Sequence, residues 1–194
     1  MIRIRPFLCL LAASGEEDVK GRIGPVFLMA IIAATLSGAC RESPTTPEPP
    51  NIEELDFAPG LGVEITGMTR LNSGLYIRDL VEGEGPRAEP QVGVRFNFQG
   101  WLHDGTPVDM GTYPANRFSP GAYVNPFNGE VYYLVGSGQT IAAWDLGLDG
   151  MRVGGRRQLV VPPRLAFGGA GSSDGRVPGN AVLVYVLEVL AVEP

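Results

Sequence analysis

Glycine and proline recur throughout the chain, with 27 glycines and 17 prolines among 194 residues. Glycine admits backbone conformations that other residues avoid, and proline lacks the N–H group that helices and sheets use. The segments between these residues are short, so the sequence favours short strands joined by turns over long helices. The apolar fraction of 44% is enough for a packed core, which excludes a chain that is disordered throughout.

Alternation of apolar and polar residues predicts the strands. Residues 92–99 alternate with period two and carry β-branched and aromatic side chains, which indicates a half-buried strand. Residues 74–81, 131–135, 157–161 and 182–190 also have strand character. The pair Arg156–Arg157 is interpreted as a solvated strand start. The segment from Met110 to Glu130 holds three prolines and three glycines and is predicted to be a long irregular loop.

One short helix is predicted between residues 140 and 151. Ile141, Trp144 and Leu148 are spaced as on one helix face, and Gly150 would end the helix. A sheet needs a cover for its apolar face, and this helix is the best candidate in the sequence. The predicted fold class is therefore α+β, with antiparallel strands packed on one helix.

The first sixty residues have a different character. An apolar run from Ile23 to Ala39 follows Lys20 and Arg22, which is the pattern of a secretory signal. The small residues before Cys40 resemble a lipoprotein signal, in which the cysteine is lipidated; an uncleaved anchor and simple cleavage remain alternatives. The acidic residues before Lys20 suit a signal poorly, which raises the hypothesis that translation starts near Val19.

The predicted organisation has three parts. Residues 1–39 form the signal region, 40–54 a Cys-led flexible linker rich in proline, threonine, serine and glutamate, and 55–194 the folded domain. The protein is expected to be exported and lipid-anchored at Cys40 on the periplasmic side of a membrane.

Composition excludes several kinds of chemistry. The net charge is −6 and there is no basic run, which argues against a nucleic-acid partner. The chain has two cysteines, Cys9 and Cys40, and one histidine, His103, which lies in a predicted turn. Catalysis by a histidine-activated nucleophile and a histidine–cysteine metal site are therefore not expected. No cofactor is expected either.

Three ordered blocks resemble the FKBP-type peptidyl-prolyl cis-trans isomerases. They are VGSGQTIAAWDLGLDGMRVGGRRQLVVPPRLAFG at 135–168, FNFQGWLHDGTPVD at 96–109 and VPGNAVLVYVLEVL at 177–190. The resemblance implies a five- or six-stranded antiparallel sheet curved around one helix. The substrate pocket would lie between the helix and the concave face of that sheet.

The resemblance also implies the site. The catalytic set would be Phe98, Asp109, Ile141, Trp144, Phe167 and Tyr185, and the substrate-binding set Val108, Val131, Tyr133, Thr140 and Val177. Trp144 would be the pocket floor and Asp109 the acidic group at the rim. The main-chain N–H of Ile141 would donate a hydrogen bond to a substrate carbonyl.

Some positions depart from the family pattern. Phe98 and Phe167 stand where tyrosine is usual, and Val108 and Val131 stand where phenylalanine is common. The expected function is isomerisation of X–Pro bonds in exported proteins, with macrolide inhibitors of the family bound more weakly. The alternative is a non-catalytic, chaperone-like module that binds proline-containing polypeptides. A monomer is expected.

Overall fold

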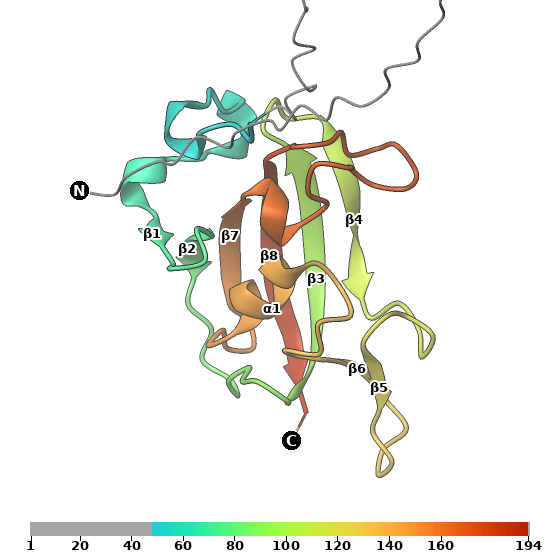
Figure 1. The fold of residues 1–194 in the computed structure, drawn as a ribbon. Coiled ribbons are helices and arrows are strands. Elements are labelled where there is room, and N and C mark those ends of the chain that lie inside the picture. The colour runs from blue at the N-terminus through green and yellow to red at the C-terminus, as the bar shows by residue number, and fades with distance from the viewer. Residues whose placement is uncertain (1–47, 194) are drawn as a thin grey trace, which may run out of the picture. The chain divides into compact units, whose positions relative to one another are not determined.

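The structure is a computed structural model, and it describes residues 48–193. These residues form an antiparallel sheet of eight strands packed on one α-helix (Figure 1). The hydrogen-bonded strand order is β1-β2-β7-β8-β3-β6-β5. The strand β4 pairs with residues 96–101 of β3, beyond the two residues of β3 that pair with β6. The long strands β3 and β8 lie side by side in the middle, so the sheet is built around them.

The strand bounds are Thr69–Arg70 for β1, Tyr76–Val81 for β2, Gly93–Leu102 for β3, Pro107–Tyr113 for β4, Ala122–Val124 for β5, Val131–Leu134 for β6, Arg156–Val161 for β7 and Leu183–Val192 for β8. The helix α1 spans Ala142–Leu148, and the 3-10 helices η1 to η4 span Ile52–Glu54, Pro59–Leu61, Ile65–Gly67 and Pro163–Leu165.

The inner face of the sheet carries the main core. Side chains from alternate positions of β3, β7 and β8, such as Phe96, Leu159 and Leu187, pack against α1 and are fully buried. Gly147 allows the helix to approach β7, because a Cβ at this position would lie 2.6 Å from Cδ1 of Leu159. Glycine is unfavourable inside a helix, but the packing of α1 on β7 requires it at position 147.

The outer face of the sheet is partly covered by the segment that precedes β1. Ile52 is buried there with Tyr76, Val160 and Val184, and Phe57 is among the side chains that pack on this cluster. The Tyr76 hydroxyl donates a hydrogen bond of 2.8 Å to Glu53. The last residues of the predicted linker therefore form η1 and pack on the sheet, so packing begins before residue 55.

The fold class and the antiparallel pairing are confirmed, but the sheet has eight strands where five or six were expected. The segment 110–130 is less irregular than predicted. It contains the end of β4 and the strand β5, which pairs with β6 in a hairpin that extends from the sheet (Figure 1). The short β1 and β5 account for the difference in strand number. The predicted helix exists but is seven residues long.

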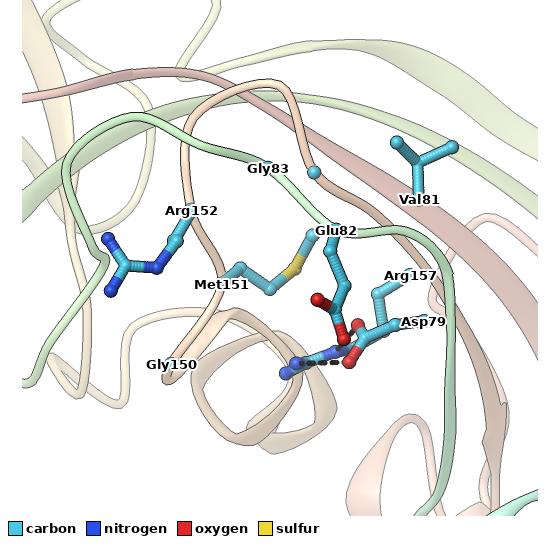
Figure 2. A pocket seen from close by; sticks show the side chains of 9 residues that line it. Asp79, Val81, Glu82, Gly83, Gly150, Met151, Arg152 and Arg157 are labelled. Atoms are coloured by element: carbon cyan, nitrogen blue, oxygen red, sulfur yellow. Dashed lines mark hydrogen bonds and ion pairs between the residues drawn. The ribbon is translucent and has the colours of Figure 1, made fainter.

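The prediction for Arg157 is wrong, because its side chain is only 10% exposed. Its guanidinium binds both carboxylate oxygens of Asp79, at 2.6 and 3.1 Å. It also donates to the carbonyls of Gly147 and Asp149, which have no partner within the helix. Figure 2 shows this ion pair at a cavity of about 170 Å³ beside Glu82. Arg157 thus ties the end of α1 to β2 and β7.

Several predictions concern residues outside the described part of the chain. The signal region at 1–39, the alternative start near Val19 and lipidation of Cys40 all belong to this group. Within residues 48–193, no helix has the length and apolar character to cross a membrane.

Candidate active site

A cavity of about 260 Å³ opens at the end of the sheet near the turn between β3 and β4. It is lined by Val108, Asp109, Phe167, Ser172, Ser173, Asp174, Arg176, Val177 and Tyr185. Five residues that the sequence analysis assigned to the pocket are in this lining: Val108, Asp109, Phe167, Val177 and Tyr185. Positions far apart in the sequence are therefore brought to one cavity, as the resemblance implied.

A β-bulge directs two successive residues of β4 to the cavity. Asp109 pairs with Gly100, but the next pair is Pro107 with Trp101, so Val108 is the extra residue. In a regular strand, neighbouring side chains point to opposite faces, and the bulge removes this constraint. Val108 is buried against the core, while the exposed Asp109 brings a carboxylate to the rim.

The Tyr185 ring lies against β3 at Gly100, the residue paired with it. A Cβ at Gly100 would lie 2.4 Å from Cε1 of Tyr185, so only glycine leaves room for the ring. Burial, and then the negative charge of Asp109, raise the pKa of Tyr185 to about 12, with Arg176 acting in the opposite direction. The phenol is therefore neutral at physiological pH.

Trp144 is surrounded by aromatic rings and is only 7% exposed. Its ring centroid lies 4.8 Å from that of Phe98, 5.3 Å from Phe96 and 5.9 Å from Tyr185. Tyr113 packs on it at 5.1 Å. Trp144, which was expected to be the pocket floor, is thus covered by other rings and does not line the cavity, whereas Tyr185 does. The Trp144 Nε1 is buried, and it has no hydrogen-bond acceptor within residues 48–193.

Asp145 fixes the segment that leads into α1. Its carboxylate accepts hydrogen bonds from the Tyr133 hydroxyl at 2.5 Å and from the N–H groups of Gly136 and Gly138 at 2.7 and 3.1 Å. The Tyr133 hydroxyl also contacts the Thr140 hydroxyl at 2.8 Å. Burial and the hydrogen bond to Asp145 raise the pKa of Tyr133 to about 12.

This network changes the interpretation of two expected substrate-binding residues. Tyr133 is fully buried in the core, and its hydroxyl is satisfied by Asp145 and Thr140. Both side chains therefore hold the loop before Ile141, whereas the prediction placed them against the substrate. Ile141 itself is partly buried beside the core, and its N–H has no acceptor within the described residues.

Val131 was expected to form a pocket wall, and the structure places it elsewhere. It lies on β6 opposite Val124 of β5, at the outer end of the hairpin. It is not among the partly buried apolar side chains that pack on the main core. The strand β5, which the sequence did not predict, pairs with the strand that carries Val131, and Val131 is not part of the cavity lining.

Two residues near the site were missed by sequence reasoning. Tyr113 was assigned to an irregular loop, because no alternation marks the end of β4. Arg176 donates from Nη1 to the carbonyl of Val108 at 3.0 Å and pairs with Asp174 at 2.6 Å. It therefore fastens the loop after η4 to β4 across the rim of the cavity. A lone arginine in a glycine-rich loop gave no signal for this contact.

The fold and the site define a class of protein. An antiparallel sheet and one helix enclose an aromatic cluster. Beside it lies a cavity with an apolar wall of Val108, Phe167, Val177 and Tyr185 and a polar rim that includes Asp109, Asp174 and Arg176. Among the described residues that line the cavity, none is a histidine or cysteine. Such a site can receive an apolar group against its apolar wall.

Comparison with known proteins agrees with this class. A family model described as FKBP-type peptidyl-prolyl cis-trans isomerase matches residues 85–190. An FK506-binding protein of Streptomyces anulatus is 34% identical over 119 residues, which cover 61% of this chain and 86% of that protein. The chain therefore belongs to the FKBP-type peptidyl-prolyl cis-trans isomerase family, and it is an isomerase of X–Pro peptide bonds.

Two further matches extend the comparison. The photosynthetic NDH subunit of lumenal location 4, a chloroplastic protein of Arabidopsis thaliana, is 29% identical over 97% of this chain and 84% of its own length. The crystal structure of a peptidyl-prolyl cis-trans isomerase from Pseudomonas syringae superposes with a TM-score of 0.51. It covers 70% of this chain and 87% of that one at 24% identity, and so supports the fold.

Proposed function

We propose that this isomerase acts on X–Pro bonds of exported polypeptides and is held at the periplasmic side of a membrane by a lipid on Cys40. The apolar run before Cys40 and the proline-rich residues after it are the basis for this placement. Similarity to a lumenal chloroplast protein over nearly the whole chain supports an exported location.

The catalytic proposal starts from the amide bond. Resonance gives the C–N bond partial double-bond character, with a rotation barrier of roughly 18–20 kcal/mol. In the twisted transition state this resonance is lost, so the amide is less polar than in either planar form. An apolar cavity desolvates the twisted amide at lower cost than the planar amide, and it accelerates rotation if it binds the twisted form more tightly.

One observation carries the proposal: the cavity wall and an unpaired N–H both adjoin Trp144. The Tyr185 ring, which lines the cavity, packs on Trp144, and the Ile141 carbonyl accepts a hydrogen bond from the main-chain N–H of Trp144. Phe167, Val177 and Tyr185 supply the apolar wall. The N–H of Ile141 is held by the Asp145 network and is available to a substrate carbonyl. Asp109 at the rim would orient the amide by its charge.

Phenylalanine in place of tyrosine at position 167 should affect the affinity for macrolides more than the rate of isomerisation. A tyrosine at this position would bring a hydroxyl to the cavity, and one hydrogen bond contributes about 0.5–1.5 kcal/mol net. Its loss would weaken binding of a macrolide that accepts such a bond. The twisted amide needs an apolar surface, which phenylalanine retains.

The catalytic part is tested with single variants in a proline-peptide isomerisation assay. Replacing Asp109 by Asn is expected to lower kcat/KM by about tenfold, which corresponds to about 1.4 kcal/mol of transition-state stabilisation. Asp149→Asn is the matched control, because Asp149 is also exposed but lies outside the cavity lining. Equal activity of the two variants would exclude a role for Asp109.

The anchoring part is tested separately in cells that express the full chain. Metabolic labelling with a radioactive fatty acid should label the protein, and cell fractionation should find the labelled protein in the membrane fraction. Cys40→Ala should remove the label and release the protein from membranes. A Cys40→Ala protein that keeps its label would contradict lipidation at this position and leave the isomerase assignment unaffected.

A further inference from the structure

Tyr113 is the last residue of β4 and faces the same side of the sheet as the aromatic core. It pairs with Phe96 of β3 in the antiparallel register. Directly paired residues share a face of the sheet, and Phe98 is on that face two residues further along β3. The extension of β4 into the segment predicted to be a loop therefore brings the Tyr113 ring to the inner face.

The Tyr113 ring contacts four other rings of the aromatic cluster. Its centroid lies 5.1 Å from Trp144, 5.7 Å from both Phe96 and Tyr133, and 6.4 Å from Phe98. The plane of the Tyr113 ring is inclined at 65° to that of Trp144 and at 72° to that of Phe98. Both are edge-to-face arrangements, which aromatic pairs favour. The side chain thus contacts the two residues that the pocket was expected to present to a proline ring.

The Tyr113 hydroxyl fixes the ring in this position. It donates a hydrogen bond of 2.7 Å to the carbonyl of Pro120. The following residue, Gly121, accepts a hydrogen bond of 3.0 Å from the N–H of Leu134 in β6. Tyr113 is therefore connected through its own loop to the sheet, and the loop closes beside the ring.

Tyr113 differs from the other rings around Trp144 in its accessibility. Phe96 and Tyr133 are fully buried, while Phe98 and Tyr185 are 7% and 3% exposed. Tyr113 is only partly buried, so it is the most exposed of the rings that pack on Trp144. The Nε1 of the neighbouring Trp144 is buried without an acceptor in the described residues, and such an orphan donor points to a ligand.

Two side chains that the resemblance assigned to the pocket walls are valines, where phenylalanine is common in the family. Val108 is an aliphatic side chain at the bulge, and Val131 lies in the β5–β6 hairpin, outside the main core cluster. We propose that Tyr113 is the missing aromatic wall, a substrate-contacting residue that packs on the prolyl ring next to Trp144. The assignment deepens the proposed function, because it relies on the proline binding at the aromatic cluster.

The experiment compares variants of the full chain in a Trp101→Phe background, where Trp144 is the only tryptophan. Tyr113→Ala is expected to lower kcat/KM by about tenfold, because an aromatic contact and its buried area together contribute about 1.4 kcal/mol. Tyr113→Phe, which keeps the ring, should retain most of the activity. Tyr123→Ala is the matched control, since Tyr123 is partly buried on β5 outside the cluster.

A second measurement on the unsubstituted protein does not depend on the folding of any variant. With a proline-containing tetrapeptide bound, Tyr113 ring protons should give an intermolecular nuclear Overhauser effect to the proline ring, and Tyr123 should give none. Normal activity of Tyr113→Ala together with no such effect would overturn the proposal. Increased activity of Tyr113→Ala would also overturn it, because the ring would then only obstruct the site. An inactive parent protein would instead contradict the proposed function.

Discussion

The aromatic cluster around Trp144 has two sides that are built differently. On the first side, Phe98 and Tyr185 project from the long central strands β3 and β8. On the second side, Tyr113 projects from the end of the edge strand β4, and its position depends on the loop that follows. We call these the strand side and the loop side of the cluster.

The difference concerns what each side contributes. Residues of the strand side are almost fully buried and belong to the core that stabilises the fold. Tyr113 on the loop side is partly exposed, so its replacement removes less buried area. Substitutions on the strand side should therefore reduce stability and activity together. Substitution of Tyr113 on the loop side should reduce activity with a smaller loss of stability.

Trp144→Ala is the largest perturbation, and it gives the loss of stability expected when a buried ring of the cluster is removed. Removing a buried aromatic side chain leaves a cavity, and the expected loss in free energy of unfolding is about 3–5 kcal/mol. Denaturant unfolding measures this loss, with Phe118→Ala as a control because Phe118 is 84% exposed. If Tyr113→Ala destabilises the protein as much as Trp144→Ala, the distinction between the two sides is wrong.

Arg157→Met tests whether the helix needs its tether to the sheet. The substitution keeps much of the volume but leaves the carbonyls of Gly147 and Asp149 and the carboxylate of Asp79 without their partner. Removing one partner of a buried pair costs about 3–5 kcal/mol. We expect about 2–3 kcal/mol here, because the Asp79 side chain is 41% exposed and can be solvated. Arg156→Met, at an exposed position of the same strand, should change stability little.

Alkaline pH tests the burial of Tyr185. The folded-state pKa is raised from 10.0 to about 12, so the folded protein holds the phenolic proton more tightly than the unfolded chain. This stabilisation is complete below pH 10 and is lost as the pH rises to about 12. The loss for this one group is on the order of 2 kcal/mol. Unfolding measured against pH should show a smaller decline for Tyr185→Phe, and an identical decline would contradict the burial.

Asp145→Asn gives the smallest expected effect and tests the network that holds the segment before α1. The amide keeps the size of the carboxylate but loses its charge, which should cost about 1 kcal/mol of stability. Because the Asp145 charge contributes to the raised pKa of Tyr133, this pKa should fall in the variant. Ultraviolet titration of the tyrosines would detect the change. An unchanged titration curve would mean that the Tyr133–Asp145 contact is absent in solution.

The sequence predicted the strand side well because its side chains follow a regular period. Alternation along β3 and β8 and the helical spacing of Ile141 and Trp144 fix which residues face inward. The loop side has no such period: Tyr113 follows a bulge and precedes a proline-rich loop, so its orientation depends on the register with Phe96. The same limit applies to Val131, whose surroundings depend on the unpredicted strand β5.

Buried polar contacts were the other part that the sequence could not supply. Arg157 looks like a surface residue beside Arg156, and its partner Asp79 is distant in the sequence. The family resemblance implied that Tyr133 is a substrate-binding residue, but its hydroxyl binds Asp145. Contacts of this kind are set by the packing of the helix on the sheet, which no local pattern encodes.

The account depends on an aromatic cavity that binds a twisted prolyl amide more tightly than either planar form. Exchange spectroscopy of a proline-containing peptide measures cis-trans interconversion directly, without a coupled protease. With the full chain added, the exchange rate should rise in proportion to protein concentration and fall in the Tyr185→Ala variant. A rate that stays at the value of the free peptide, with the protein folded, would contradict the account.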